Sequence, residues 1–191
     1  MIIYGNNPYL EASFTLKHRF GRLAWNVVDA LLFRPSPRPC HAWRSWLLHL
    51  FGARVGKGCH VYPGVKVWAP WNLRLGNSVG IADGVTLYSM ESIEIGDYAV
   101  ISQGAHLCGG THDYNSANFQ LIAKPIIIGA YAWVCAEVFI HPGVIVPEGA
   151  VLGARAVVCK SLAQPWAVYA GNPCQQVGTR QKTENGKGKI L

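Results

Sequence analysis

The chain has 191 residues, of which 50% are hydrophobic and only 14% are charged. This length suits one domain with a sizeable core. The six cysteines include no CxxC pair, and the N-terminus lacks the features of a secretory signal, so we expect a cytoplasmic protein that folds without disulfides. No stretch reaches the roughly 18–20 continuous apolar residues that a membrane-spanning helix needs.

The formal net charge of +7 is concentrated at the two ends of the chain. Residues 1–57 carry +6, residues 58–173 carry −2 and residues 174–191 carry +3. A nucleic-acid-binding domain would need a basic stripe on a folded face. The glycine-rich middle of the chain has no such stripe, so we expect no nucleic acid partner.

The N-terminal residues 1–54 form a basic flank in which we expect two short helices. The stretches 20–33 and 41–52 are rich in apolar residues of helical character. The segment RPSPRP at 34–39 separates them, because proline is poorly tolerated inside a helix.

From residue 55 onward an aliphatic side chain recurs at every sixth position. A helix would space its apolar residues by three and four, and a half-buried strand by two, so this period fits neither as one continuous element. Four residues after most of these positions comes a small or β-branched residue, and we expect both sets to point inward. The first set comprises Val55, Val61, Val67, Leu75, Ile81, Leu87, Ile95, Ile101, Leu107, Ile128, Val134, Ile140, Val146, Leu152 and Val158. The second set comprises Cys59, Val65, Val79, Val85, Ala99, Ala105, Thr111, Ala132, Val138, Val144, Ala150 and Ala156.

Three six-residue faces that close into one triangular turn make a coil of about 18 residues, and stacked coils bury aliphatic columns. We therefore predict an all-β fold, a parallel β-helix of about five coils within residues 55–173. Two short insertions, at 69–74 and 89–93, need only bulge a corner, whereas residues 113–127 make one long excursion. We expect the remaining residues, 174–191, to form a flexible C-terminal tail.

Long loops in a regular scaffold often carry function, and His112 stands where the chain leaves the repeat for the excursion. A neutral imidazole has a reference pKa near 6.5 and can take the proton from a hydroxyl group. Among the other histidines, His18, His41 and His49 lie in the N-terminal flank, where we expect surface or interfacial roles. His112 is therefore the candidate general base.

The repeat resembles that of the hexapeptide-repeat acyltransferases, in which an aliphatic residue is often followed by glycine, two variable positions and a small residue. The segments LCGGTHDY and PIIIGAYAWVCAEVFIHPGV resemble those of the galactoside and maltose acetyltransferases and their exopolysaccharide relatives. The resemblance implies a left-handed coil, acetyl-CoA as cosubstrate and His112 as the base. It also implies that Trp133 lines the coenzyme A site and that the backbone N–H of Ala136 binds the thioester oxygen.

The closing segment VVCKSLAQPWAVYAGNPC also resembles this family. The resemblance implies that Lys160 contacts a phosphate of coenzyme A, and that Gly153 and Ala154 expose backbone polar groups to the cofactor. The sequence departs from the galactoside enzymes at IADGVTLY, where those enzymes place an asparagine that positions the acceptor. Asp83 is the nearest polar residue and the candidate for that role.

Nearly the whole chain resembles the colanic-acid-type exopolysaccharide acetyltransferases, which share the NPYLEASF opening and the RPSPRP break. This resemblance implies a homotrimer with sites between neighbouring chains, and a sugar or lipid-linked saccharide acceptor at the inner face of the membrane. The basic flank, with Trp25, Trp43 and Trp46, could rest on anionic headgroups. It could also cap the open end of the β-helix, and the two roles are compatible.

Other functions remain open. The γ-type carbonic anhydrases use the same prism with three histidines on a metal ion, but their ligand spacing differs from that of His106 and His112, so we expect no metal. A non-catalytic scaffold would give no reason for the excursion and the closing lysine segment to occur together. Cys108 could act as a nucleophile, but it shares a repeat position with Cys135 and Cys159, which favours a stacked apolar column.

Overall fold

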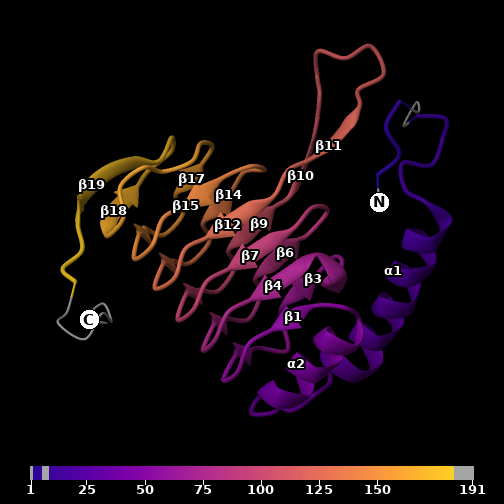
Figure 1. Cartoon of the computed structure of the whole chain (residues 1–191), viewed down its shortest axis with the longest axis horizontal. Helices are drawn as coiled ribbons and strands as arrows, with labels where there is room; N and C mark the ends of the chain where they lie inside the picture. The colour runs from indigo at the N-terminus through magenta and orange to yellow at the C-terminus, as the bar shows by residue number, and fades with distance from the viewer. Residues whose placement is uncertain (1, 6–8, 183–191) are drawn as a thin grey trace.

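The computed structural model describes residues 2–5 and 9–182 and consists of a parallel β-helix with two helices at its start (Figure 1). Three sheets form the faces of a triangular prism, which confirms the predicted fold class. The first face contains β1 (Arg54–Val55), β4 (Leu73–Leu75), β7 (Ile93–Ile95), β12 (Ile126–Ile128) and β15 (Ile145–Val146). The second contains β2 (His60–Val61), β5 (Gly80–Ile81), β8 (Val100–Ile101), β13 (Trp133–Val134), β16 (Val151–Leu152) and β18 (Ala167–Ala170). The third contains β3 (Lys66–Val67), β6 (Thr86–Tyr88), β9 (His106–Cys108), β14 (Phe139–Ile140) and β17 (Val157–Val158).

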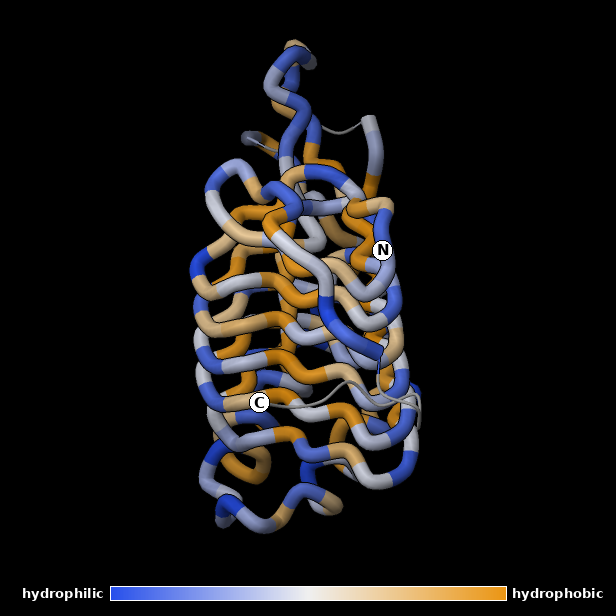
Figure 2. The backbone as a smooth tube through the Cα atoms, turned by 90° about the vertical axis from the view of Figure 1, so that its left-hand side faces the viewer, coloured by the Kyte–Doolittle hydropathy of each residue, from blue (hydrophilic) through white to orange (hydrophobic). Residues whose placement is uncertain are grey.

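The six-residue repeat forms the core, because almost every predicted inward side chain is buried. Burial of one such aliphatic side chain contributes about 1.5–3 kcal/mol, so the stacked columns dominate the stability of the prism. Figure 2 shows hydrophobic residues aligned in successive coils. Two of the predicted inward positions are not buried. Val55 is half-buried in the first coil, and Thr111 is exposed because it lies outside the prism in a hairpin.

The coils pair in parallel without a register shift, so each side chain stacks on its counterpart in the next coil. Val61 pairs with Ile81, Ile81 with Ile101, and Ile101 with Val134, although 33 residues separate the last two in sequence. At the corners the chain passes through left-handed backbone conformations, with φ of 76° at Gly84, which a glycine adopts without strain.

The prism contains five complete coils, and β18 adds a sixth layer to the second face alone. The start of the predicted flexible C-terminal tail forms a strand instead: β19 (Gln175–Thr179) pairs antiparallel with β18. This pairing covers a strand that would otherwise be an open sheet edge. The rest of the predicted tail, 183–191, lies outside the described residues.

The N-terminal flank closes the end of the prism at β1, as expected for a cap. Helix α1 (Leu16–Val28) continues into a π-helical turn (Asp29–Phe33), and α2 (His41–Leu50) follows the proline-rich break. Leu47 and Leu48 of α2 are buried in the same core as the coils. Arg44 is fully buried and donates hydrogen bonds to the carbonyls of Val61, Pro37 and Arg38. No helix of the described residues is long and apolar enough to span a membrane.

Two residues of the flank differ from the sequence predictions. Trp25 is 1% exposed and donates from Nε1 to the carbonyl of Val67 at 2.7 Å, so it cannot rest on a membrane surface. His18 is buried rather than at the surface, because its ring packs against Trp68 and Trp71. Burial, and then nearby positive charges that include Arg22, together lower the pKa of His18 to about 4, so the imidazole is neutral.

The three predicted interruptions all occur at one corner of the prism. Pro70–Asn72 form a single 3₁₀ turn (η2), and residues 89–92 bulge between β6 and β7. The long excursion is a β-hairpin that begins earlier than predicted, at Gly109, whose carbonyl accepts from the N–H of Lys124 at 3.1 Å. We call residues 109–124 the arm. It projects away from the prism (Figure 1).

Candidate active site

The arm carries His112 at the end of its first strand. Strand β10 (Gly110–His112) pairs antiparallel with β11 (Leu121–Ala123), and His112 lies opposite Leu121. Beyond the strands, the N–H of Asp113 donates to the carbonyl of Gln120 at 2.8 Å and extends the ladder. His112 is therefore held on a paired strand, not on a free loop.

The imidazole of His112 is oriented by Phe119, which the sequence did not identify as part of the site. Nδ1 of His112 lies 2.8 Å from the carbonyl oxygen of Phe119, and a carbonyl only accepts, so Nδ1 carries the proton. The two rings stack with centroids 4.4 Å apart at 11°. In the neutral imidazole this leaves Nε2 unprotonated, as a general base requires. Asp113, the next residue in the chain, does not orient the imidazole, and its carboxylate accepts from the N–H of Asn115.

The N-terminal segment packs against the arm. The N–H of Gly5 donates to Oε1 of Gln120 at 3.0 Å. Ile2 and Leu121 share a small apolar cluster with Met90, and the ring of Tyr9 lies 6.5 Å from that of Phe119. The arm is thus supported on one side by residues that precede the helices.

The other predicted site residues lie along two edges of the prism. Edge A joins the second and third faces and is formed by the corner residues 62–65, 82–85, 102–105, 135–138 and 153–156. Edge B joins the third and first faces and is formed by residues 68–72, 89–92, the arm, 141–144 and 159–162. Ala136, Gly153, Ala154 and Asp83 lie on edge A, whereas His112 and Lys160 lie on edge B.

Ala136 occupies a corner whose backbone is partly used by the next coil. Its carbonyl accepts from the N–H of Arg155 at 2.9 Å, and the N–H of Gly153 donates to the carbonyl of Tyr169 at 2.7 Å. In contrast, the N–H groups of Ala136 and Ala154 have no hydrogen-bond acceptor among the described residues, 2–5 and 9–182. These two donors are available to a ligand, although the equivalent corner residue Gln103 has the same property.

Trp133 lies on the second face next to edge A. Its side chain is 37% exposed, and its Nε1 donates to Oγ of Ser102 at 3.0 Å. Within β13 it lies in register between Val100 and Val151. The ring is therefore fixed in orientation with part of its surface open, which suits contact with a flat or elongated ligand.

An exposed ion pair flanks the free donors of edge A. Nε of Arg155 lies 2.6 Å from Oε2 of Glu137, and both residues have left-handed backbones with φ near 60°. The hydrogen bond from Arg155 lowers the pKa of Glu137, so the carboxylate stays charged. The pair carries one charge of each sign beside Ala136 and Ala154.

Asp83 has structural partners. Its Oδ1 accepts from the N–H of Gly64 at 2.8 Å, and Oδ2 lies 3.9 Å from the guanidinium of Arg38. The carboxylate thus ties the first coil to the second. Its role in positioning an acceptor stays a prediction.

A single chain does not bring His112 and Ala136 together. The five residue steps from Ala136 to His141 cross the third face, which corresponds to roughly 16 Å of extended strand. The arm leaves edge B and points away from the prism instead of folding back toward edge A (Figure 1). Within one chain the structure therefore brings together only the edge A group.

Aromatic side chains cover the third face between the edges. The ring of His106 lies 5.0 Å from that of Phe139 and 6.5 Å from that of Tyr88. Its Nε2 is buried without a partner in the described part of the chain. Burial, and then the charge of Lys66, lowers the pKa of His106, so this imidazole is neutral. No group of three or more potential metal ligands occurs among the described residues.

The cysteines do not stack as the sequence suggested. Cys108 ends β9 on the third face and Cys135 follows β13 on the second, so they lie on different sides of the prism. The Cys108 thiol donates to the carbonyl of Gly110 at 3.2 Å and thereby helps to fix the base of the arm.

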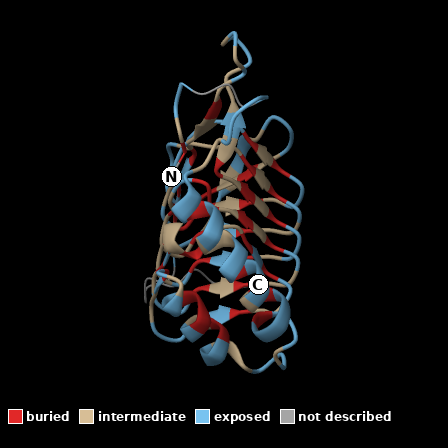
Figure 3. Ribbon diagram, turned by 90° about the vertical axis from the view of Figure 1, so that its right-hand side faces the viewer, coloured by how far each residue is buried: buried red, intermediate tan, exposed pale blue. Residues whose placement is uncertain are grey.

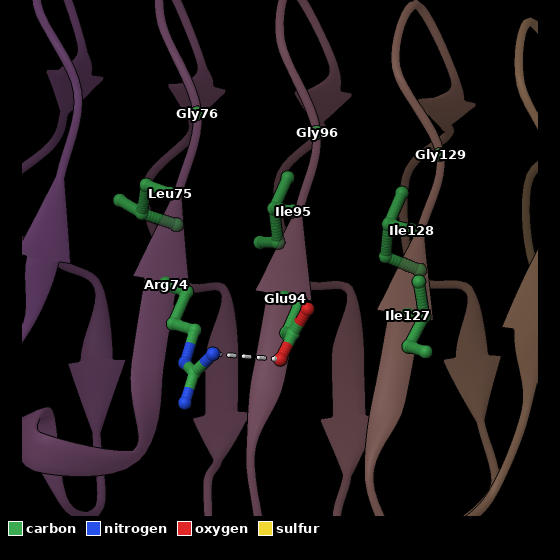
Figure 4. Close-up of a pocket in the computed structure, with 9 residues that line it drawn as sticks. All are labelled: Arg74, Leu75, Gly76, Glu94, Ile95, Gly96, Ile127, Ile128 and Gly129. Carbon is green, nitrogen blue, oxygen red and sulfur yellow. Dashed lines mark ion pairs between the residues drawn. The ribbon is translucent and has the colours of Figure 1, made fainter.

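One groove on the surface lies away from all of these residues. It has a volume of about 370 Å³ and crosses β4, β7 and β12 on the first face (Figure 4). Arg74 and Glu94 form an ion pair of 3.5 Å along it, and Ile127 adds an exposed apolar side chain. The groove contains no predicted site residue.

Comparisons with known proteins identify relatives of the same fold. The chain is 43% identical to WcaF of Escherichia coli (strain K12), named as an acetyltransferase of colanic acid biosynthesis, over 160 residues that cover 84% of this chain and 87% of WcaF. A galactoside acetyltransferase in complex with coenzyme A matches with a TM-score of 0.80 and 25% identity, over 88% of this chain and 84% of that one. A hexapeptide-repeat acetyltransferase from Vibrio cholerae, solved with acetyl-CoA, matches with a TM-score of 0.79 and 20% identity. The match covers 88% of this chain and 91% of that one. No protein-family model matches the chain.

Proposed function

The chain belongs to the family of hexapeptide-repeat acetyltransferases that includes WcaF, and from this membership we propose that it transfers an acetyl group from acetyl-CoA to a sugar hydroxyl in exopolysaccharide biosynthesis. The observation that carries the proposal is the hydrogen bond from Nδ1 of His112 to the carbonyl of Phe119. It leaves Nε2 as a proton acceptor on a projecting, hydrogen-bonded hairpin. The acceptor is a saccharide, free or linked to a lipid.

The reaction is a direct transfer in a complex of all three components. Nε2 of His112 removes the proton from the acceptor hydroxyl, and the oxygen attacks the carbonyl carbon of the thioester. The N–H of Ala136 donates to the carbonyl oxygen as it becomes negative. When the tetrahedral intermediate collapses, the C–S bond breaks and the thiolate of coenzyme A takes the proton back from the imidazolium. No covalent acyl-enzyme forms, so Cys108 has no chemical role.

The cofactor lies along edge A. Trp133 contacts the coenzyme A arm with its open ring surface, and Gly153 and Ala154 present backbone groups beside it. Lys160 is exposed on edge B, so it binds a phosphate of this cofactor from the neighbouring protomer, as a mobile point charge. Asp83, on the same edge, faces the acceptor side of the site.

The active site is shared between neighbouring chains of a homotrimer. His112 and the edge A group are separated by the third face within one chain, so a complete site needs the arm of one protomer beside edge A of the next. The exposed ring of Phe119 at the end of the arm supports this arrangement, since association would cover it. We place the enzyme in the cytoplasm, where acetyl-CoA is available, and its six cysteines are all free.

The proposal is tested by release of free coenzyme A thiol with a panel of sugar acceptors. His112→Ala should lower turnover by roughly 10²–10⁴-fold, as expected for loss of a general base. The KM for acetyl-CoA should stay within about twofold, because His112 does not bind the donor. His60→Ala is the matched control, because His60 is an exposed histidine on the prism. Turnover by His112→Ala at the wild-type rate would contradict the assignment.

The shared site is tested by complementation. His112→Ala would be co-expressed with Ala154→Trp, which places a bulky ring at an exposed position of the cofactor edge. Each variant alone should be inactive, whereas mixed trimers should regain about a quarter of wild-type activity, because one interface in four combines an intact arm with an intact edge A. If mixing regains nothing, each site lies within a single chain.

A further inference from the structure

The outer surface of α1 is apolar where a surface helix is normally polar. Leu16, Phe20, Leu23 and Val27 are each 50–67% exposed and follow one another at helical spacings of three and four. They lie on the side of the helix opposite the buried Trp25. The packing of the chain itself therefore does not explain these side chains.

The apolar surface continues from α1 onto α2. Nε1 of Trp43 donates to the carbonyl of Leu32 at 3.1 Å, which joins α2 to the turn that follows α1. The rings of Trp43 and Trp46 stack with centroids 5.1 Å apart. We call the whole surface the helix patch. It comprises Leu16, Phe20, Leu23, Val27, Leu31, Leu32, Trp43, Trp46 and Leu50, which are nine of the twenty exposed large apolar side chains in the described residues. Figure 3 shows these helices exposed at the end of the prism.

The charges around the helix patch are almost all positive. Lys17 and Arg19 are exposed on either side of the α1 stripe. Asp29 is the only acidic residue in 12–57, and it is buried with Oδ2 2.6 Å from Nε of Arg34. The exposed basic residues of this segment are Lys17, Arg19, Arg34, Arg38, Arg54 and Lys57.

We propose that the helix patch binds the surface of an anionic lipid bilayer. An amphipathic helix with apolar and aromatic side chains flanked by lysine and arginine lies in the interface of a membrane, where the side chains enter the headgroup region and the charges meet anionic lipids. Tryptophan suits this depth, because its ring is apolar and its N–H can remain hydrogen-bonded. Trp43 and Trp46 would enter, whereas the buried Trp25 would not.

A bilayer fits the helix patch better than a second copy of the chain. Two helix patches face to face would bring like charges together, which opposes association. The proposed trimer joins prisms through edges A and B. Helix α2 covers the end of the prism (Figure 1), whereas α1 packs its buried side on Trp68 and Trp71 of edge B and keeps its apolar stripe outward. In a trimer three helix patches would lie near one end, and their combined binding would exceed that of one.

Vesicle sedimentation tests this inference without acetyl-CoA or acceptor, so its outcome is independent of the proposed chemistry. The full chain should bind vesicles of phosphatidylcholine mixed with phosphatidylglycerol, and bind at least about tenfold more weakly to phosphatidylcholine alone. Trp43→Ser with Trp46→Ser, and separately Lys17→Gln with Arg19→Gln, should each weaken binding to the mixed vesicles by about tenfold or more. All these side chains are exposed, but Trp43 also donates to the carbonyl of Leu32, so melting temperatures are measured first and binding is compared between folded variants.

Ile145→Ser and Val177→Ser are the controls, because both residues are exposed and lie outside the helix patch. They should bind vesicles as the wild type does. Absence of wild-type binding, equal binding to both vesicle types, or unchanged binding by the patch variants would each overturn the inference. So would a fall in molar mass of the Trp43→Ser, Trp46→Ser variant by light scattering without lipid, because the patch would then join two copies of the chain.

Discussion

Replacing Phe119 by glycine should slow acetyl transfer by a predictable amount, because the ring of Phe119 holds the imidazole of His112 in place. A stacked aromatic pair of this geometry contributes about 0.5–1.5 kcal/mol, which corresponds to about two- to twelvefold in rate if it is lost in the transition state. Phe119 has a left-handed backbone with φ of 49°, so glycine fits the turn without strain and keeps the carbonyl that accepts from Nδ1.

Initial rates of coenzyme A thiol release, measured against both substrates, separate the effects. The kcat should fall, while the KM for acetyl-CoA should stay unchanged, because the proposed donor site is on edge A and does not include Phe119. Phe119→Tyr keeps the ring and should retain the wild-type kcat. Phe119→Ala should lower kcat as glycine does, because it also removes the ring, but its arm should be less stable than that of the glycine variant by about 1 kcal/mol, since a residue with a Cβ is strained in this conformation. The reasoning is refuted if the glycine and alanine variants both keep the wild-type kcat.

Two further predictions concern stability. The pKa of His18 is about 4 in the folded chain and about 6.5 in the unfolded chain, so stability should fall by up to about 3 kcal/mol as the pH drops between these values. Urea unfolding across this pH range should show this fall in the free energy of unfolding for the wild type and a smaller fall for His18→Phe. Equal pH dependence of the two proteins would contradict the role of His18. Arg44→Met should cost about 3 kcal/mol or more, because it leaves buried carbonyls without donors. Thermal melting checks this, with the exposed Arg38→Met as control; an unchanged melting temperature would refute the role of Arg44 in the cap.

The six-residue period predicted the core because every coil repeats the same environment. A side chain such as Ile101 meets the same neighbours above and below, so one pattern describes all of them. The period does not identify the face on which a residue lies. Cys108 and Cys135 share a repeat position, but the excursion between them leaves their relative face undetermined, and they lie on different sheets.

The candidate site could be read from the sequence only residue by residue, without the contacts between its members. His112 stands out by its place before the excursion, and its Nδ1 partner could not be found from sequence because a backbone carbonyl has no residue signature. The register of the hairpin and the left-handed turn at Phe119 create that contact. Burial of His18 was missed for a related reason, since its ring is enclosed by tryptophans more than 45 positions away.

The arm is inserted without disturbing the stack. Leu107 pairs with Ile140 and Ile101 with Val134, as if the coils before and after the arm were consecutive in sequence. The length and sequence of the arm can therefore change over evolution with little effect on folding of the prism. Related enzymes can therefore differ in this one hairpin and still keep the same β-helix.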